Sequence, residues 1–74
     1  MASVDKLVHK MKNQPNGIIM AEADKVLEHY GYRLDRQKGS HCQYINKYGD
    51  VITIKKEQPL KAVYVKNVLT RIGV

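Results

Sequence analysis

The stretch YRLDRQKGSHCQYINKYGDVITIK, residues 32–55, decides the fold. Polar and apolar side chains alternate along it, and this period of two predicts half-buried strands at residues 32–37, 41–46 and 51–55. Turn-forming residues separate these strands at 37–40 and again at 47–50. Strands that follow one another through such short turns pair with their neighbours in the chain. We therefore expect a three-stranded antiparallel meander.

Helical patterns lie on both sides of the strands. Ser3 is a suitable cap for a first helix, whose apolar residues recur at i, i+3, i+4 and i+7 as Val4, Leu7, Val8 and Met11. A second helix is expected over residues 20–30, with Gly31 as its left-handed cap, and a third over residues 62–72, ending at Gly73. The order α-α-β-β-β-α predicts an α+β fold in which helices and sheet form two layers.

Length and composition fit one small domain. The chain has 74 residues, of which 43% are hydrophobic, so a small core can form without cross-links. The single cysteine, Cys42, excludes an intramolecular disulfide framework and a cysteine-based zinc site. No apolar run approaches the ~18 residues of a membrane span, and residues 1–19 lack the apolar region of a signal peptide. We expect a single cytoplasmic domain over residues 1–74 that does not associate with a membrane.

The charge is distributed unevenly along the chain. Thirteen Lys and Arg against seven Asp and Glu give a net charge of +6. Residues 1–32 are balanced, whereas residues 33–74 hold nine basic and three acidic side chains and so carry the whole excess. Such concentration favours a polyanionic partner, most commonly nucleic acid. The alternative is charge that serves solubility alone.

The densest polar cluster is the run RQKGSH, from Arg36 to His41, between the first two predicted strands. Gly39 can adopt a positive φ, which lets a turn backbone approach a ligand closely. Backbone N–H groups, the Ser40 hydroxyl, Arg36 and Lys38 together form a plausible phosphate site. A histidine beside a bound phosphate can move the protons needed for RNA cleavage without a metal. The alternative is a hairpin loop with an incidental histidine.

A second group of basic residues follows the third strand, at Lys55, Lys56, Lys61 and Lys66. These lysines could follow a phosphate backbone across the sheet edge, or they could form a solvated face. The histidines and the cysteine show no spacing typical of metal ligands, so we expect neither a metal nor another cofactor. If His41 faces solvent, alternation places Cys42 and Tyr44 in the core.

The same residues resemble a known family. The run LDRQKGSHCQY at 34–44, then VITI at 51–54 and Leu60-Lys61 before the last helix, resembles the HicA toxins, small mRNA interferases of toxin–antitoxin systems. Residues 23–27, ADKVL, and 30–32, YGY, match the first core helix of that family and its exit into the sheet. The resemblance covers about residues 20–73, which is most of the chain, and we expect residues 1–19 to form an additional helix and turn before the core at 20–74.

The resemblance implies a double-stranded-RNA-binding-domain-like α-β-β-β-α fold and endonucleolytic cleavage of mRNA with an essential histidine, here His41. It also implies neutralisation by a HicB-type antitoxin, which we expect to be acidic. The segment before the last helix often reads PGTL in the family, but residues 62–65 read AVYV here. That departure leaves open how this end contacts RNA. The additional helix either covers the hydrophobic layer or offers a partner site.

We interpret the chain as a metal-independent endoribonuclease with His41 as its general acid/base. The residues expected to bind RNA are Arg36, Lys38, Gly39, Ser40, Lys55, Lys56, Lys61 and Lys66. The alternative from another class is a non-catalytic RNA-binding module that uses the same basic face. A purely structural or protein-interaction domain is disfavoured by the uneven charge.

Overall fold

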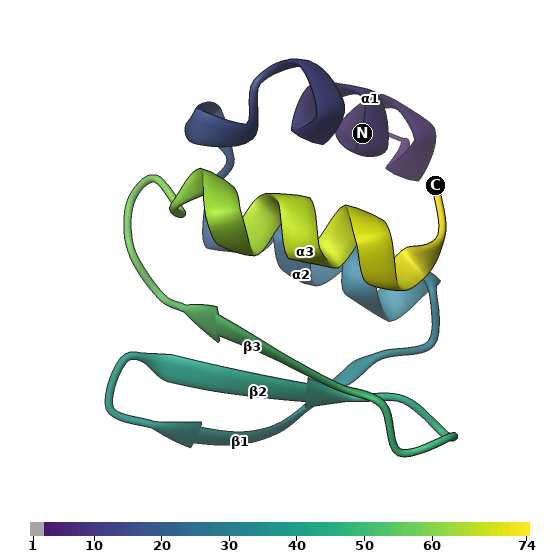
Figure 1. Cartoon of the computed structure of the whole chain (residues 1–74), viewed down its shortest axis with the longest axis vertical. Helices are drawn as coiled ribbons and strands as arrows, with labels where there is room; N and C mark the ends of the chain where they lie inside the picture. Colours follow the sequence, from purple (N-terminus) through teal and green to yellow (C-terminus); the bar gives the residue numbers. More distant parts are fainter. Residues whose placement is uncertain (1–2) are drawn as a thin grey trace.

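A computed structural model describes residues 3–74 and shows three α-helices and one sheet of three strands (Figure 1). The elements are α1 (Val4–Asn13), a short 3-10 turn (Pro15–Gly17), α2 (Met20–His29), β1 (Arg33–Lys38), β2 (His41–Ile45), β3 (Val51–Lys55) and α3 (Ala62–Ile72). The sheet order is β1-β2-β3 with both pairs antiparallel, which confirms the expected meander.

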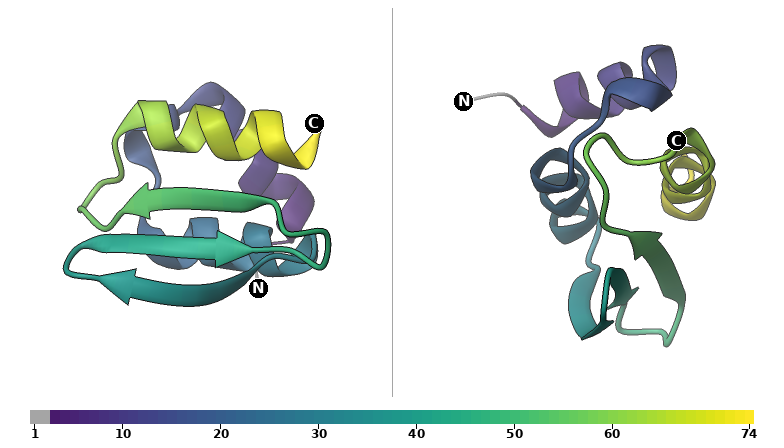
Figure 2. Two further views of the ribbon diagram at one scale, coloured as in Figure 1. Left: turned by 60° about the horizontal axis from the view of Figure 1, so that its bottom comes forward. Right: turned by 90° about the vertical axis from the view of Figure 1, so that its left-hand side faces the viewer.

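Helices cover only one face of the sheet. Figure 2 shows α2 and α3 side by side above this face, with α3 beside β3, and α1 lies across the far side of the helix pair. The fold is therefore the α+β arrangement predicted from the sequence, with α1 as the additional element. The opposite face of the sheet, here called the outer face, is covered by no helix of the described residues 3–74 (Figure 2).

The helix ends follow local capping chemistry. Ser3 Oγ accepts a hydrogen bond from the Lys6 N–H at 3.3 Å and caps α1 as predicted. At the start of α2 the Glu22 carboxylate accepts from the Ile19 N–H at 3.1 Å, which is half of a capping box. After α2, Gly31 has φ +87°, the left-handed conformation expected from the sequence.

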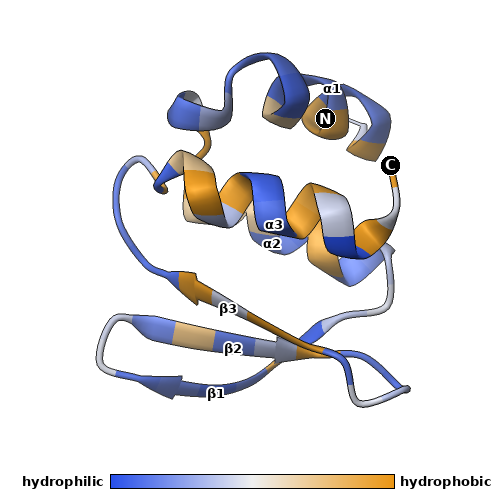
Figure 3. Ribbon diagram, in the orientation of Figure 1, coloured by the Kyte–Doolittle hydropathy of each residue, from blue (hydrophilic) through white to orange (hydrophobic). Residues whose placement is uncertain are grey.

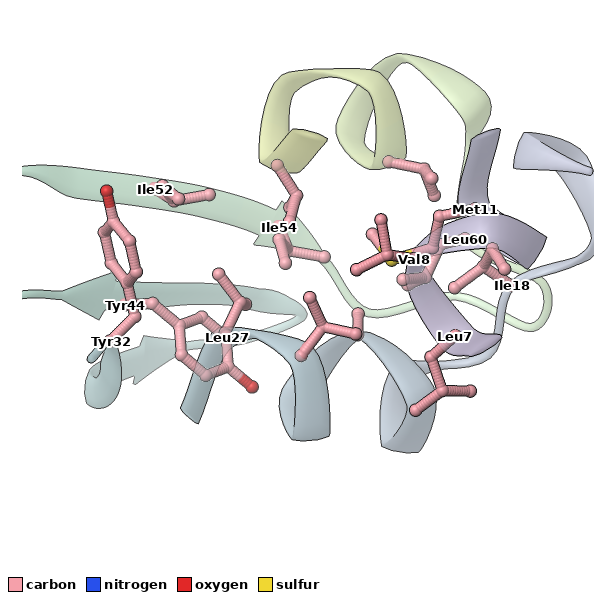
Figure 4. Packing of buried hydrophobic residues seen from close by; sticks show 14 of the residues in the cluster. Leu7, Val8, Met11, Ile18, Leu27, Tyr32, Tyr44, Ile52, Ile54 and Leu60 are labelled. Atoms are coloured by element: carbon pink, nitrogen blue, oxygen red, sulfur yellow. The ribbon is translucent and has the colours of Figure 1, made fainter. Parts of the chain in front are cut away.

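One continuous hydrophobic cluster joins the layers (Figure 4). The alternating residues Cys42, Tyr44, Ile52 and Ile54 point from the sheet toward the helices, as the period of two predicts. α1 adds Leu7, Val8 and Met11 to the same cluster, so this helix covers the hydrophobic layer. Figure 3 shows the complementary pattern, with polar residues along β1.

β1 departs from its sequence prediction. The alternation indicated a half-buried strand, but all six residues of β1 are exposed. β1 is an edge strand, and its register with β2 shifts between Leu34 and Arg36. Leu34 pairs with Tyr44 and Arg36 with Gln43, so Asp35 is the extra residue of a β-bulge. Leu34 faces the helix side yet remains 48% exposed, because no helix side chain fully covers it.

Asp50 ties the end of the sheet to two other elements. Its carboxylate accepts a hydrogen bond from the Tyr32 hydroxyl at 2.5 Å and forms an ion pair with Arg71 of α3. Burial and the bond to Asp50 raise the pKa of Tyr32, so this phenol remains a donor. No helix within residues 3–74 is long and apolar enough to span a membrane.

Candidate functional site

The register of the sheet sets which side chains share the outer face, because directly paired residues point to the same side. One cross-strand row consists of Lys38 of β1, His41 of β2 and Lys55 of β3. We call this the Lys–His–Lys row. Two further rows lie beside it along the strands: Arg36, Gln43 and Thr53, then Arg33, Ile45 and Val51.

His41 is the central member of the Lys–His–Lys row. It begins β2 and is exposed, whereas the next residue, Cys42, is buried on the opposite face. This confirms the orientation predicted from alternation. Directly paired side chains have Cβ atoms about 4.5–5.5 Å apart, so both lysines lie within reach of one phosphate group placed over His41. The row can therefore combine a proton-transferring imidazole with two cations.

The bulge at Asp35 decides which basic residues join this face. In an unbroken strand Arg33 and Arg36 would point to opposite sides. The extra residue shifts the alternation by one position, so both arginines point outward, while Leu34 points toward the helices. Arg33 is the basic residue that the sequence analysis missed, since regular alternation separates it from Arg36.

The β1–β2 hairpin tip carries the predicted phosphate site. Gly39 has φ +60° and Ser40 has a negative φ, as in a type II′ turn with glycine at its first central position. Both carbonyls of the turn are used: Gly39 O accepts from Gln37 Nε2 at 3.1 Å, and Ser40 O accepts from the Lys56 N–H at 2.6 Å. The N–H groups of Gly39 and Ser40 have no partner within residues 3–74. They are available to an anion.

The cations of the outer face are mostly unneutralised. Lys55 pairs with Glu57 at 3.0 Å, whereas Arg33, Arg36 and Lys38 have no acidic partner in the described part of the chain. No acidic side chain occupies a register-paired position on this face. Unpaired cations on an exposed sheet surface attract a polyanion.

The other predicted lysines do not share the outer face. Lys56 follows β3, and its side chain borders a cavity on the helix side of the sheet. Lys61 is the residue that caps α3, and Lys66 is exposed on α3 itself, in the helix layer. The structure thus brings Arg36, Lys38 and Lys55 to His41 and leaves Lys61 and Lys66 on the other side of the sheet.

The remaining titratable groups support the fold. The Tyr44 hydroxyl donates to Asp24 Oδ1 at 2.7 Å, and burial followed by this bond raises the pKa of Tyr44 far above its ordinary value. His9 and His29 are exposed on α1 and α2. Among residues 3–74, no three His, Cys, Asp or Glu side chains lie close enough to hold a metal ion.

Comparison with known proteins agrees with this arrangement. A family model described as the HicA toxin of bacterial toxin–antitoxin systems matches residues 20–74, which leaves only α1 and the turn before α2 outside the match. No curated protein and no solved structure matches the chain. Within the matched range, the order α2-β1-β2-β3-α3 is the double-stranded-RNA-binding-domain-like fold. The chain belongs to the HicA toxin family of bacterial toxin–antitoxin systems.

Proposed function

We propose that this toxin is an endoribonuclease that cleaves mRNA without a metal ion, with His41 as its general acid/base. The observation that carries the proposal is the Lys–His–Lys row, in which an exposed imidazole stands between two lysines on an open, cationic sheet face. Histidine titrates near neutral pH and can both accept and release a proton there. Membership of the HicA family supports the same chemistry.

The reaction that fits these groups uses the 2′-hydroxyl of the RNA as its nucleophile. His41 takes the hydroxyl proton as the 2′-oxygen attacks the adjacent phosphorus. The bond from phosphorus to the 5′-oxygen of the next nucleotide then breaks, and this oxygen receives a proton from the imidazolium. The products are a 2′,3′-cyclic phosphate and a free 5′-hydroxyl, so atoms and protons balance. DNA lacks the nucleophile and is not cleaved.

The neighbours of His41 stabilise the charge that develops on phosphate. The ammonium groups of Lys38 and Lys55 lie on either side of the pentacovalent phosphorus that forms when the 2′-oxygen attacks. The free N–H groups of Gly39 and Ser40 lie at the hairpin end, next to this row. Arg33 and Arg36 extend the positive surface along β1 and hold the flanking RNA backbone. Lys56, Lys61 and Lys66 contact RNA segments that pass around the sheet.

The same face explains how the toxin is held inactive. An acidic HicB-type antitoxin that covers the outer face neutralises its cations and excludes RNA from His41. The toxin meets its mRNA substrate in the cytoplasm. The additional helix α1 lies across the helix layer, away from the outer face, and leaves this surface open (Figure 2).

Product chemistry tests the proposal. Purified protein is incubated with a defined single-stranded RNA and a chelator, with a DNA of the same sequence as control. We expect RNA fragments that end in 2′,3′-cyclic phosphate, and intact DNA. A single 2′-deoxy substitution at the cut site should block cleavage there. RNA that is bound but never cut would contradict the enzyme and identify a non-catalytic RNA-binding module.

A further inference from the structure

A cavity of about 350 Å³ lies on the helix side of the sheet, between the start of α2 and the β1–β2 hairpin. Its apolar walls are Met20 and Ala21 of α2 and Leu34 of β1. Leu34 and Gln37 of β1 pair with the core residues Tyr44 and Cys42, and both remain exposed and line this hollow. An apolar hollow of this size is suited to one planar ring system of the size of a nucleobase.

The cavity lies directly behind the Lys–His–Lys row. Each member of the row has a neighbour in the chain that lines the cavity: Gln37 precedes Lys38, Cys42 follows His41, and Lys56, just beyond β3, follows Lys55. Consecutive strand residues point to opposite faces, so the row and the cavity share one stretch of backbone. An RNA strand can therefore pass from the Lys–His–Lys row to the cavity around the hairpin end or around the exposed edge strand β1.

We propose that the cavity holds one base of the RNA strand whose neighbouring phosphate lies over His41. This inference rests on the proposed function, and it adds a base-selecting site that the outer face does not contain. The RNA backbone turns around the hairpin end from the outer face, and the base enters between Leu34 and α2. Lys55 and Lys56 point to the two faces at this end, and each is placed to contact a phosphate along that path.

The polar rim supplies groups that distinguish bases. Gln37 donates from Nε2 to Gly39 O at 3.1 Å, so its amide is held in place and its Oε1 can accept from a base. Asp24 accepts from the Tyr44 hydroxyl through Oδ1, and its second oxygen can accept a base N–H. A base that presents one hydrogen-bond donor to Gln37 Oε1 and another to the second carboxylate oxygen of Asp24 should therefore fit best. Recognition of splayed-out single-stranded bases by such edges is the usual route to RNA specificity.

The direct test compares ligands with and without a base. Backbone amide signals of the labelled protein are followed by NMR while each of the four ribonucleoside 5′-monophosphates is added, and ribose 5-phosphate serves as the matched control. We expect at least one nucleotide to shift the signals of Ala21, Leu34 and Cys42. Ribose 5-phosphate should leave these three signals unchanged. Equal shifts with ribose 5-phosphate, or none with any nucleotide, would overturn the proposal.

A filled cavity provides the second test. Ala21 is exposed on α2, so Ala21→Leu adds an apolar side chain to the cavity wall without disturbing the core. Asn13→Leu adds the same side chain to an exposed position of α1, outside the lining of the cavity, and serves as control. Nucleotide affinity should fall about fivefold or more in Ala21→Leu and stay unchanged in Asn13→Leu. Equal behaviour of the two variants would refute a base in this cavity.

The two proposals fail in different ways. His41→Ala should keep the nucleotide-induced shifts, because the ring lies on the opposite face from the cavity. Base-dependent shifts in a protein that never cuts RNA would refute the nuclease and support the base site. Conversely, if the wild type cuts a random RNA pool and Ala21→Leu cuts it with an identical base preference, the base site is wrong and the nuclease stands. Reduced affinity of Ala21→Leu for the antitoxin alone would assign the cavity to a protein side chain instead.

Discussion

Lys55 Nζ lies 3.0 Å from Glu57 Oε1, so the lysine beside His41 is ion-paired in the free protein. The two side chains keep 37% and 28% of their surface exposed, which makes the pair easy to break. A phosphate that approaches His41 must compete with the Glu57 carboxylate for the same ammonium group. In the proposed mode of RNA binding, Glu57 is therefore a competitor of the RNA phosphate for Lys55.

The first prediction follows from this competition. Glu57→Gln removes the competing charge, so the variant should bind RNA about two- to fivefold more tightly, the range expected from an exposed ion pair of about 0.5–1 kcal/mol. Glu28→Gln makes the same charge change on α2, away from the outer face, and is the matched control. Fluorescence anisotropy with a labelled RNA measures both. Equal affinities of the two variants would show that Lys55 does not meet the RNA phosphate.

The second prediction separates catalysis from binding at His41. His41→Ala should reduce the rate of RNA cleavage by about 10²–10⁴-fold or more, because it removes the proton-transferring group. The side chain is exposed, so the free energy of unfolding should change by no more than about 0.5 kcal/mol. RNA affinity should hardly change, since the neighbouring cations remain. Cleavage, anisotropy and thermal melting are measured together on variant and wild type, and wild-type cleavage by the variant would remove His41 from the mechanism.

The third prediction tests the placement of the lysines. Lys38 lies in the Lys–His–Lys row, whereas Lys66 lies on α3 in the helix layer. Lys38→Ala should weaken RNA binding. It should also make the negative slope of log affinity against log salt shallower by about 0.7, which corresponds to the loss of one phosphate contact on a single strand. Lys66→Ala should produce a smaller loss. Anisotropy titrations at several salt concentrations decide between them, and a larger effect from Lys66→Ala would locate the RNA on the helices.

The sequence predicts most of the fold because its patterns are local. The period of two set the faces of Cys42 and Tyr44 correctly, and Ser3 and Gly31 marked two helix ends. The same reasoning was wrong for β1, which is exposed along its length. No glycine or other special residue signals the bulge at Asp35, because the register shift depends on pairing with β2.

The site was predictable only in part, for the same reason. The run from Arg36 to His41 indicated the hairpin and its histidine, since these residues are adjacent in the chain. The pairing of His41 with Lys55 could not be read from it, because fourteen positions and a second hairpin separate the two residues. Arg33 was missed because regular alternation places it and Arg36 on opposite faces and only the bulge brings both to the outer face. The cavity was missed because it forms between elements that are distant in sequence.

The contact between α1 and α2 includes a titratable carboxyl group, that of Glu22. Glu22 of α2 accepts hydrogen bonds from Lys10 Nζ of α1 at 2.8 and 3.0 Å. These bonds to Lys10, aided by the Ile19 N–H, hold the pKa of Glu22 below its ordinary value of 4.5. A carboxyl group with a lowered folded-state pKa stabilises the fold fully above its unfolded pKa, and this contribution is lost as the pH falls through the folded pKa.

The last prediction concerns the stability of this attachment. At neutral pH, Glu22→Gln should lower the free energy of unfolding by about 0.5–1 kcal/mol, a modest value because Lys10 keeps 39% of its side chain exposed. The wild type should lose stability on acidification below pH 4.5, whereas Glu22→Gln should lose less over the same interval, so the gap between the two narrows. Urea unfolding at neutral pH and at pH about 3 measures this difference. Glu28→Gln, which alters an exposed carboxyl group on the same helix, should follow the wild type at both values. A constant gap between wild type and Glu22→Gln would show that the ionised Glu22 carboxylate does not anchor α1.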